Sequence, residues 1–283
     1  MANQWAPNIP PRPSRSLAGR VAIVTGAGAE GEGIGNGRAA AVLLAEAGAY
    51  VVCVDVREEM TATTIKMIEQ DGKGKAISFK ADVTQKDECK AIVDKAVQTW
   101  GRLDILVNNV GINGPKGNAV DVDMEGWTNA MNVNVTSMVL MAKYAIPEMK
   151  KNTDTHMYKG SIVNIGSVAG LKGGIPHILY PTTKGAVVNM TRAMAAHHAP
   201  DGIRVNCVCP GMVFTPMMYL SDEGSFMTPE MREKRKGRSL MRTEGSGWDI
   251  GAGVRYLSSD EARWVTGVIL PVDAGATAAV LLG

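Results

Sequence analysis

A tyrosine, a lysine and a serine lie close enough in the sequence to act on one substrate atom. Tyr180 and Lys184 are four residues apart, a spacing that places two side chains on one face of a helix. A tyrosine ordinarily has a pKa near ~10 and exchanges protons near neutral pH only beside a positive charge. Ser167 precedes Tyr180 by 13 residues, and a serine hydroxyl can donate a hydrogen bond to the same substrate oxygen. The three residues therefore predict acid–base chemistry at a hydroxyl or carbonyl group.

The surrounding sequence places these residues between a strand and a helix. Residues 161–166 are rich in β-branched side chains and are bounded by glycines, which is the pattern of a buried strand. Ser167 then falls at the carboxyl end of that strand. An apolar segment with helical spacing runs from Tyr180 to Ala196. Many Tyr-x-x-x-Lys pairs lie on solvated helix faces, so the rest of the chain decides between a surface pair and a catalytic pair.

A glycine-rich loop near the N-terminus indicates a dinucleotide site. Residues 20–25 are predicted as a strand, residues 26–37 form the loop, residues 38–47 are predicted as a helix, and residues 50–55 as a second strand. In such a unit the backbone amides and the helix N-terminus face a pyrophosphate. The second strand ends in Asp55, and this context makes the glycine loop more than a flexible turn.

Asp55 favours NAD over NADP. Its carboxylate can accept hydrogen bonds from both ribose hydroxyls of NAD, whereas a 2′-phosphate in that position meets a like charge. At ~4 Å and an effective dielectric near 20, the repulsion is on the order of 4 kcal/mol per charge pair. Arg57, two residues further on, is the feature that favours NADP instead.

The alternation of strands and helices continues along the chain. Strands are predicted at residues 76–79, 103–107 and 203–208, with one helix through Ile92, Val93, Ala96 and Val97 and a longer one at residues 127–149. Repeated alternation predicts an α/β fold with a doubly wound parallel sheet, covered on both faces, whose ligands gather at the carboxyl ends of the strands. The residues at or near such ends are Thr25, Asp55, Asp82, Asn108, Ser167 and Pro210.

Composition limits the classes of protein to which the chain can belong. Its 283 residues are 45% hydrophobic and 20% charged, enough for one large domain, residues 19–283, after a proline-rich extended tail at residues 1–18. A net charge of +2 gives no reason to expect a nucleic-acid or membrane partner. No stretch has the ~18 apolar residues of a membrane span, and no secretory signal is evident. We therefore expect a cytoplasmic protein.

The cysteines predict neither a disulfide framework nor a metal site. There are four of them, scattered along the chain, which suits a reducing compartment. Cys207 and Cys209 share one face of a predicted strand, but no histidine or further cysteine is close to them in sequence. Packing is the expected role of this pair, and no metal is expected.

The segment after Pro210 has two interpretations. Soft apolar residues gather there, which suits a mobile lid over an apolar substrate at about residues 212–245 or, alternatively, ordinary core contacts of a helix pair. They are Met212, Met217, Met218, Leu220, Phe226, Met227 and Met231. The basic run at residues 232–238 is either a solvated helix face or a docking site for an acidic carrier protein or a coenzyme A phosphate.

In combination these residues resemble the short-chain dehydrogenase/reductase family, of the common single-domain type, over about residues 17–275. The matching positions are Thr25, Gly26, Asp55, Asp82, Val83, Asn108, Asn109, Gly111, Asn134, Ser167, Tyr180, Lys184, Pro210, Gly211, Thr215, Thr266, Gly267, Val272, Asp273 and Gly275. The resemblance implies a single Rossmann-like domain with a helical substrate lid.

The resemblance also implies residue roles. Tyr180 acts as acid or base, and Lys184 both perturbs Tyr180 and binds the nicotinamide ribose. Ser167 holds the substrate oxygen. Asn134 distorts the long helix and anchors a water that links Lys184 to solvent. The implied cofactor contacts are Gly26, Gly28, Ile34, Gly35, Asn36, Asp55, Asp82, Val83, Asn109, Tyr180, Lys184, Val213 and Thr215.

Two departures from the family pattern stand out. The glycine loop after Gly26 is longer than usual, so either Gly35-Asn36-Gly37 or Gly33-Ile34-Gly35 is the segment next to the helix. Val110 replaces the usual alanine, a packing change that the fold should tolerate.

The sequence as a whole predicts an NAD-dependent oxidoreductase for a moderately apolar secondary alcohol or ketone, cyclic compounds included. One alternative is an NADPH-dependent 3-oxoacyl reductase for carrier- or coenzyme A-linked substrates. Another is a dinucleotide-binding scaffold or sensor without turnover. The resemblance further implies a homotetramer, assembled partly through the helices near residues 127–149 and 180–199.

Overall fold

The structure is a computed structural model that describes residues 12–153, 158–219 and 227–279. Seven parallel strands form one sheet in the order β3-β2-β1-β4-β5-β6-β7. The strands are β1 (Val21–Thr25), β2 (Tyr50–Asp55), β3 (Lys75–Lys80), β4 (Ile105–Asn108), β5 (Gly160–Ile165), β6 (Ile203–Pro210) and β7 (Ile269–Val272). The strand order reverses between β1 and β4, which opens a crevice at their carboxyl ends.

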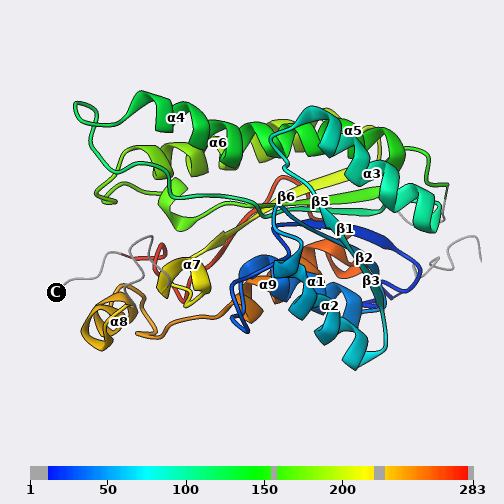
Figure 1. Ribbon diagram of the computed structural model, residues 1–283, viewed down its shortest axis with the longest axis horizontal. Coiled ribbons are helices and arrows are strands. Elements are labelled where there is room, and N and C mark those ends of the chain that lie inside the picture. The colour runs from blue at the N-terminus through cyan, green and yellow to red at the C-terminus, as the bar shows by residue number, and fades with distance from the viewer. Residues whose placement is uncertain (1–11, 154–157, 220–226, 280–283) are drawn as a thin grey trace, which may run out of the picture.

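Helices cover both faces of the sheet (Figure 1). One layer contains α1 (Asn36–Glu46), α2 (Glu59–Asp71) and α9 (Gly247–Ser258). The other contains α3 (Lys86–Trp100), α4 (Met124–Met131), α5 (Ser137–Met149) and α6 (Leu179–His198). Two short helices, α7 (Pro216–Tyr219) and α8 (Pro229–Lys236), follow β6 and lie apart from both layers. The prediction of a doubly wound parallel α/β sheet is confirmed.

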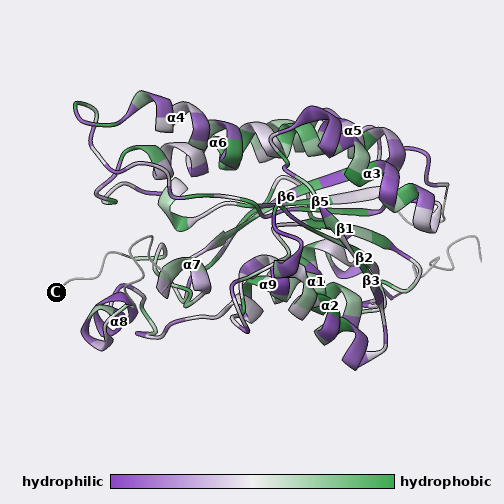
Figure 2. Ribbon diagram, in the orientation of Figure 1, coloured by the Kyte–Doolittle hydropathy of each residue, from purple (hydrophilic) through white to green (hydrophobic). Residues whose placement is uncertain are grey.

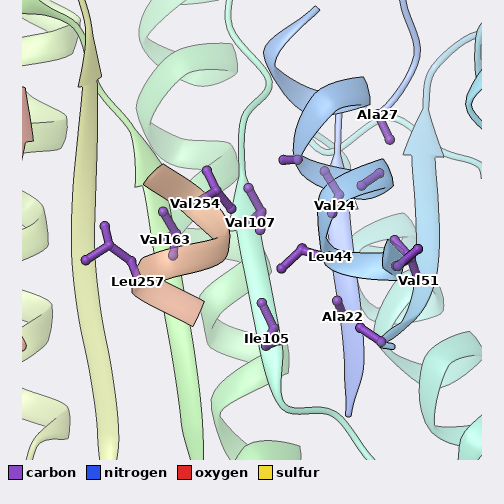
Figure 3. Packing of buried hydrophobic residues seen from close by; sticks show 14 of the residues in the cluster. Ala22, Val24, Ala27, Leu44, Val51, Ile105, Val107, Val163, Val254 and Leu257 are labelled. Carbon is purple, nitrogen blue, oxygen red and sulfur yellow. The ribbon is translucent and has the colours of Figure 1, made fainter. Parts of the chain in front are cut away.

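The core explains why the strands are almost wholly apolar. Every residue of β1 is buried, because a parallel sheet with helices on both faces has no solvent side. Leu44 of α1, with Val254 and Leu257 of α9, packs over strand residues such as Val107 and Val163 (Figure 3). Hydrophobic residues concentrate along the strands and the inner sides of the helices, whereas the outer sides are largely hydrophilic (Figure 2).

Most strands lie within two residues of their predicted bounds, but several elements were not predicted. The strand predicted at 50–55 has those bounds, and β6 continues two residues beyond the prediction, to Pro210. The helix predicted at 127–149 is divided by a π-helical turn, Asn132–Thr136. The sequence did not predict α2, α9 or β7 as elements.

The four cysteines are buried and reduced. Cys207 and Cys209 lie in an apolar cluster with Met138, Val187 and Val188, and their Sγ atoms are 3.7 Å apart. The described residues contain no group of three or more His, Cys, Asp or Glu side chains that could hold a metal ion. In the same residues, no helix is both long enough and apolar enough to span a bilayer.

The predicted tail at residues 1–18 falls partly outside the described residues, which begin at Arg12. Within it, Leu17 is fully buried in the core, and its backbone N donates to the carbonyl oxygen of Ala47 at 2.7 Å. The chain is therefore already packed against the domain just before β1, and the domain boundary at residue 18 stays a prediction.

Candidate active site

A cavity of about 930 Å³ opens at the carboxyl ends of the strands and collects most of the predicted site residues. The predicted residues that line it are Gly26, Gly28, Gly35, Asn36, Asp55, Asp82, Val83, Asn109, Ser167, Tyr180, Lys184, Val213 and Thr215. Two predicted residues, Ile34 and Asn134, do not line it. These side chains lie together because all strands of a parallel sheet end at the same edge, so the loops that follow them are neighbours.

Tyr180 and Lys184 lie one turn apart on α6, as their spacing predicts. The Nζ atom of Lys184 is 5.8 Å from the centre of the Tyr180 ring. It also donates a hydrogen bond of 2.9 Å to the carbonyl oxygen of Ile165, at the end of β5. Lys184 is 3% exposed, so its ammonium group is a fixed positive charge beside the tyrosine rather than a solvated surface charge.

Ser167 is brought to Tyr180 by close packing of backbone. Its Oγ accepts a hydrogen bond of 3.1 Å from the backbone N of Ala169 and so caps the short 3₁₀ turn Val168–Gly170. A Cβ atom on Gly170 would lie 2.4 Å from the carbonyl carbon of Lys184. Only glycine therefore allows this turn to lie directly on α6. The Ser167 hydroxyl still has its proton to donate toward the cavity.

Asn134 supports the site from behind the cavity wall. It is fully buried in the π-helical turn between α4 and α5, so the predicted distortion of the helix at this residue is present. Its amide accepts from the backbone N of Ile112 at 2.7 Å and donates to the carbonyl oxygen of Ile112 at 2.9 Å. It also donates to the hydroxyl of Thr183, next to Lys184, at 3.0 Å. Asn134 thus connects the loop after β4 to α6.

The structure decides the register of the glycine loop. Helix α1 begins at Asn36, with Gly35 as its N-cap. A Cβ atom on Gly37 would lie 2.0 Å from the carbonyl oxygen of Gly26, whereas one on Gly35 would come no closer than 3.4 Å to a neighbour, Ala29. Gly37 is therefore the glycine that lets the helix pack on the end of β1, and Gly35-Asn36-Gly37 is the helix-proximal segment.

Arg38 is a residue that sequence reasoning missed. It is fully buried, and burial lowers the pKa of its guanidinium. That group donates hydrogen bonds to the carbonyl oxygens of Ala29 and Gly31, both at 2.8 Å, and to the hydroxyl of Thr64 at 3.1 Å. It further bonds the carbonyl oxygens of Gly33 and Met60. The lengthened loop is therefore an ordered structure; an arginine in the predicted helix, directly after the glycines, was the available signal.

Asp55 lies at the end of the cavity near the glycine loop, and backbone amides orient its side chain. Its carboxylate accepts from the N of Gly28 at 3.1 Å and from the N of Arg57 at 3.2 Å. The guanidinium of Arg57 pairs with Glu30 of the glycine loop at 3.2 Å. The positive charge that favoured NADP in the sequence therefore has a carboxylate partner.

Asp82 and Asn109 complete this end of the cavity. Partial burial acts to raise the pKa of Asp82, but hydrogen bonds from Thr84 and Gln85 outweigh it and lower that pKa. The Asn109 amide donates to the carbonyl oxygens of Thr25 and Gly26 at 3.1 and 2.9 Å. Both side chains are thus held in place by local hydrogen bonds.

The segment predicted as a lid lines the cavity only in part. Met212, Met217 and Met218 line it, whereas Met227 and Met231 do not. Leu220 and Phe226 lie outside the described residues. The lining also includes two residues that the sequence had placed in the basic run, Arg235 and Arg238.

Comparison with known proteins identifies the family. A family profile described as Enoyl-(Acyl carrier protein) reductase matches residues 28–277. The chain is 40% identical to 2-(S)-hydroxypropyl-CoM dehydrogenase 3 of Xanthobacter autotrophicus, over 94% of this chain and 99% of that protein. It is 34% identical to cis-4-hydroxycyclohexanecarboxylate dehydrogenase of Sinomonas cyclohexanicum, over 93% and 98%. The chain also resembles a crystal structure from Burkholderia xenovorans that is described as a short-chain dehydrogenase/reductase. The two superpose with a TM-score of 0.85 and share 37% sequence identity, and the match covers 94% of this chain and 99% of that chain.

The chain belongs to the short-chain dehydrogenase/reductase family. As a short-chain dehydrogenase/reductase it is an oxidoreductase that acts on CH–OH groups, and the family binds nicotinamide dinucleotides.

The cavity of this short-chain dehydrogenase/reductase fits such a cofactor. The first turn of α1 has no side-chain cap and no acidic residue, so its free N–H groups suit a pyrophosphate. A Cβ atom on Gly28 would lie 2.7 Å from Asp55 Oδ2, which shows how closely the loop and the carboxylate approach each other. The helix N-terminus thus suits an anion, and the carboxylate of Asp55 beside it can accept hydrogen bonds from hydroxyl groups.

Proposed function

We propose that this short-chain dehydrogenase/reductase is NAD-dependent and interconverts a moderately apolar secondary alcohol, cyclic alcohols included, and its ketone. The observation that carries the proposal is the Lys184 ammonium, buried and fixed 5.8 Å from the Tyr180 ring, in the cavity that Ser167 also lines. A fixed cation and a hydroxyl donor beside one tyrosine are the groups that acid–base catalysis at a single substrate oxygen needs.

Each of these residues receives a role. When bound, the nicotinamide ring takes up or supplies the hydride. Tyr180 accepts the hydroxyl proton of the substrate during oxidation and returns it during reduction. Ser167 donates a hydrogen bond to the same oxygen, and Lys184 stabilises the phenolate and binds the nicotinamide ribose. Asn134 holds the loop at Ile112 in place and anchors a water that connects Lys184 to solvent.

The remaining predicted residues bind the cofactor in this proposal. The loop and the first turn of α1 hold the pyrophosphate through Gly26, Gly28, Ile34, Gly35 and Asn36. The carboxylate of Asp55 accepts hydrogen bonds from the ribose hydroxyls. Asp82 and Val83 meet the adenine, Asn109 the adenosine side, and Val213 and Thr215 the nicotinamide carboxamide.

Two contacts support NAD over NADP. Asp55 lies where a 2′-phosphate would meet a like charge, and Arg57, the nearby cation, pairs with Glu30 at 3.2 Å. The alternative is an NADPH-dependent 3-oxoacyl reductase, which the description of the matching profile keeps open. Against that alternative, Arg232 and Arg235 of the basic run are engaged by Glu244 rather than presented to a carrier protein.

The substrate class rests on the lid and on one relative. Met212, Met217 and Met218 give the cavity an adaptable apolar wall, and we assign residues 212–245 to a lid that closes over the substrate. One relative is named for a cyclic secondary alcohol, cis-4-hydroxycyclohexanecarboxylate. In this proposal the cyclic alcohol and the cofactor share the cavity of about 930 Å³.

The first experiment measures nicotinamide absorbance over a panel of secondary alcohols and ketones, with NAD(H) and NADP(H) in parallel and Tyr180→Phe as the blank. We expect turnover with NAD(H) that falls by at least about a thousandfold in Tyr180→Phe, since the proton acceptor is gone. Tyr180→Phe should still bind NADH. Retained activity in a folded Tyr180→Phe variant would overturn the catalytic assignment, a preference for NADP(H) would favour the carrier-linked reductase, and binding without turnover would favour a scaffold or sensor.

Assembly and location extend the proposal. The helices α5 and α6 lie in one outer layer (Figure 1), and we assign them to the interfaces of a homotetramer in the cytoplasm. Light scattering during size-exclusion chromatography tests the assembly, and a monomer at micromolar concentration would contradict it.

A further inference from the structure

The basic run at residues 232–238 separates into residues with different surroundings. It spans most of α8, which is largely hydrophilic in Figure 2. Arg232 stacks on the ring of Phe214, 3.7 Å from its centre, and its Nε donates to Glu244. Lys236 pairs with Glu233. Lys234 is exposed and does not line the cavity.

Arg235 and Arg238 differ from the others because both line the cavity that contains Tyr180. Arg235 donates to the carbonyl oxygen of Val213 at 3.1 Å and lies 3.6 Å from Glu244. Arg238 is exposed, and in the described part of the chain no carboxylate pairs with it. The two guanidinium groups of Arg232 and Arg235 thus pair with one buried carboxylate, Glu244, whose side chain is 3% exposed, whereas Arg238 has no such partner among the described residues.

Helix stability explains only part of this charge. Cations in the last turn of a helix stabilise it through the helix dipole and usually point to solvent. That accounts for Lys234 and Lys236, which lie in the last turn of α8 and outside the cavity lining. Arg235 also lies in that last turn, although it lines the cavity, whereas Arg238 lines the cavity beyond the end of the helix at Lys236 and has no such explanation.

The charges on the cavity wall are also unevenly distributed. The carboxylates among the lining residues are Glu30, Asp55 and Asp82, which lie in and near the glycine loop and after β2 and β3. Among the lining arginines, Arg57 lies at this same end and pairs with Glu30, whereas Arg235 and Arg238 lie after β6, and Arg235 donates to the carbonyl oxygen of Val213. An anionic substrate is therefore repelled from the adenosine end and attracted to the lid end. The Lys184 ammonium is already engaged with Ile165 and the Tyr180 ring.

We propose that Arg238, supported by Arg235, binds an oxyanion on the substrate, so that the substrate class is secondary alcohols that carry a carboxylate or a similar acidic group. The planar guanidinium matches a carboxylate with two parallel hydrogen bonds. The anion fixes the end of the substrate that lies away from Tyr180, which orients the hydroxyl carbon. This inference rests on the proposed function because it places the oxyanion in the same cavity as the catalytic tyrosine.

The test compares alcohols that differ only in charge. Two pairs serve as probes, namely 4-hydroxycyclohexanecarboxylate with its carboxamide and 3-hydroxybutyrate with 3-hydroxybutyramide. The ratio of kcat/KM for acid over amide is measured for the wild-type chain, Arg238→Gln and Lys234→Gln. Lys234→Gln removes the same charge from the same basic run, at a position outside the cavity lining. We expect a wild-type ratio of about tenfold to a hundredfold in at least one pair, kept in Lys234→Gln and reduced about tenfold or more in Arg238→Gln.

Binding measurements separate failure of this inference from failure of the proposed function. The affinities of acid and amide are measured by calorimetry with NADH-saturated Tyr180→Phe, in the presence and absence of Arg238→Gln. Tighter binding of the acid that depends on Arg238 supports the anion site even if no probe is turned over. Equal affinity for acid and amide in both pairs would overturn it. So would an equal loss for acid and amide in Arg238→Gln together with a raised KM for NAD, because Arg238 would then act on the cofactor.

Discussion

At the scale of single residues, the groups proposed to carry or support the acid–base step are held by bonds that the reaction leaves intact. Lys184 donates to a strand carbonyl, and Ser167 accepts from the backbone two residues ahead. Asn134 binds both backbone polar groups of Ile112. Such contacts fix the site before substrate arrives, which is what acid–base catalysis on one oxygen atom requires.

In the proposed function the choice of cofactor is also set by single side chains, which can be tested by removing their charges. We expect Asp55→Ser to lower the preference for NAD over NADP, measured as the ratio of kcat/KM values, by on the order of a hundredfold, since the repulsion of a 2′-phosphate is lost. Adding Glu30→Gln should lower the ratio further, because the guanidinium of Arg57 loses its 3.2 Å partner and becomes available to the phosphate.

The pairing itself provides the control for this prediction. Glu30→Gln in combination with Arg57→Gln should not add to the effect of Asp55→Ser, because no cation remains to be released. An unchanged ratio in Asp55→Ser would show that the glycine loop, and not the carboxylate, selects the cofactor.

At the scale of elements, six of the seven strands were predictable, whereas β7 and the helices α2 and α9 were not. Runs such as residues 50–55 are continuous and apolar, so their period and their bounding residues locate them in the sequence. Helix α9 contains Gly247, Gly251 and Gly253, which lower its intrinsic propensity. A Cβ atom on Gly251 would lie 2.9 Å from the carbonyl oxygen of Ala39. Gly251 therefore serves the contact with α1, a tertiary reason that no local pattern contains.

The site shows the same division. Its polar residues follow strand ends and were found from the sequence, because a parallel sheet delivers all such ends to one edge. The register of the glycine loop was not found, since it depends on which glycine meets β1 across the fold. The contacts of Arg38 with the loop carbonyls and the placement of Arg235 and Arg238 on the cavity wall likewise depend on segments distant in sequence.

The glycine register leads to a prediction with a matched pair of variants. Gly37→Ala adds a methyl group whose carbon would lie 2.0 Å from the carbonyl oxygen of Gly26, so the start of α1 must move away from β1. We expect the free energy of unfolding to fall by about 2–3 kcal/mol, measured by urea denaturation. Gly35→Ala has room, with 3.4 Å to Ala29 and an N-cap φ of −78°, and should change stability by less than about 1 kcal/mol. Equal losses in the two variants would contradict this register.

At the scale of the whole molecule, the two helix layers enclose the interior of the sheet so completely that even a titratable side chain there, the thiol of Cys53, loses contact with water. Cys53, in the middle of β2, is fully buried in the cluster on the α1 and α9 side. Burial raises the pKa of its thiol to about 12. A thiol in the unfolded chain ionises near ~8.5, so the native and unfolded states bind different numbers of protons in the alkaline range.

The sign of the resulting pH dependence follows from proton linkage. Because the folded pKa is raised, the contribution of Cys53 to stability is fully present below pH ~8.5 and is lost as the pH rises toward about 12. Between pH 7.5 and pH 10 the loss from this one thiol should reach about 2 kcal/mol.

Urea denaturation of the wild-type chain and of Cys53→Ala at the two pH values measures this loss of stability. The cavity left by the substitution costs the same at both, so Cys53→Ala should lose about 2 kcal/mol less than the wild-type chain on going to pH 10. Val51→Ala removes a buried side chain from the same strand without removing a titratable group, so it should keep the wild-type pH dependence. If Cys53→Ala behaved as Val51→Ala does, the thiol would ionise in the folded protein, and the core around β2 would have to admit water.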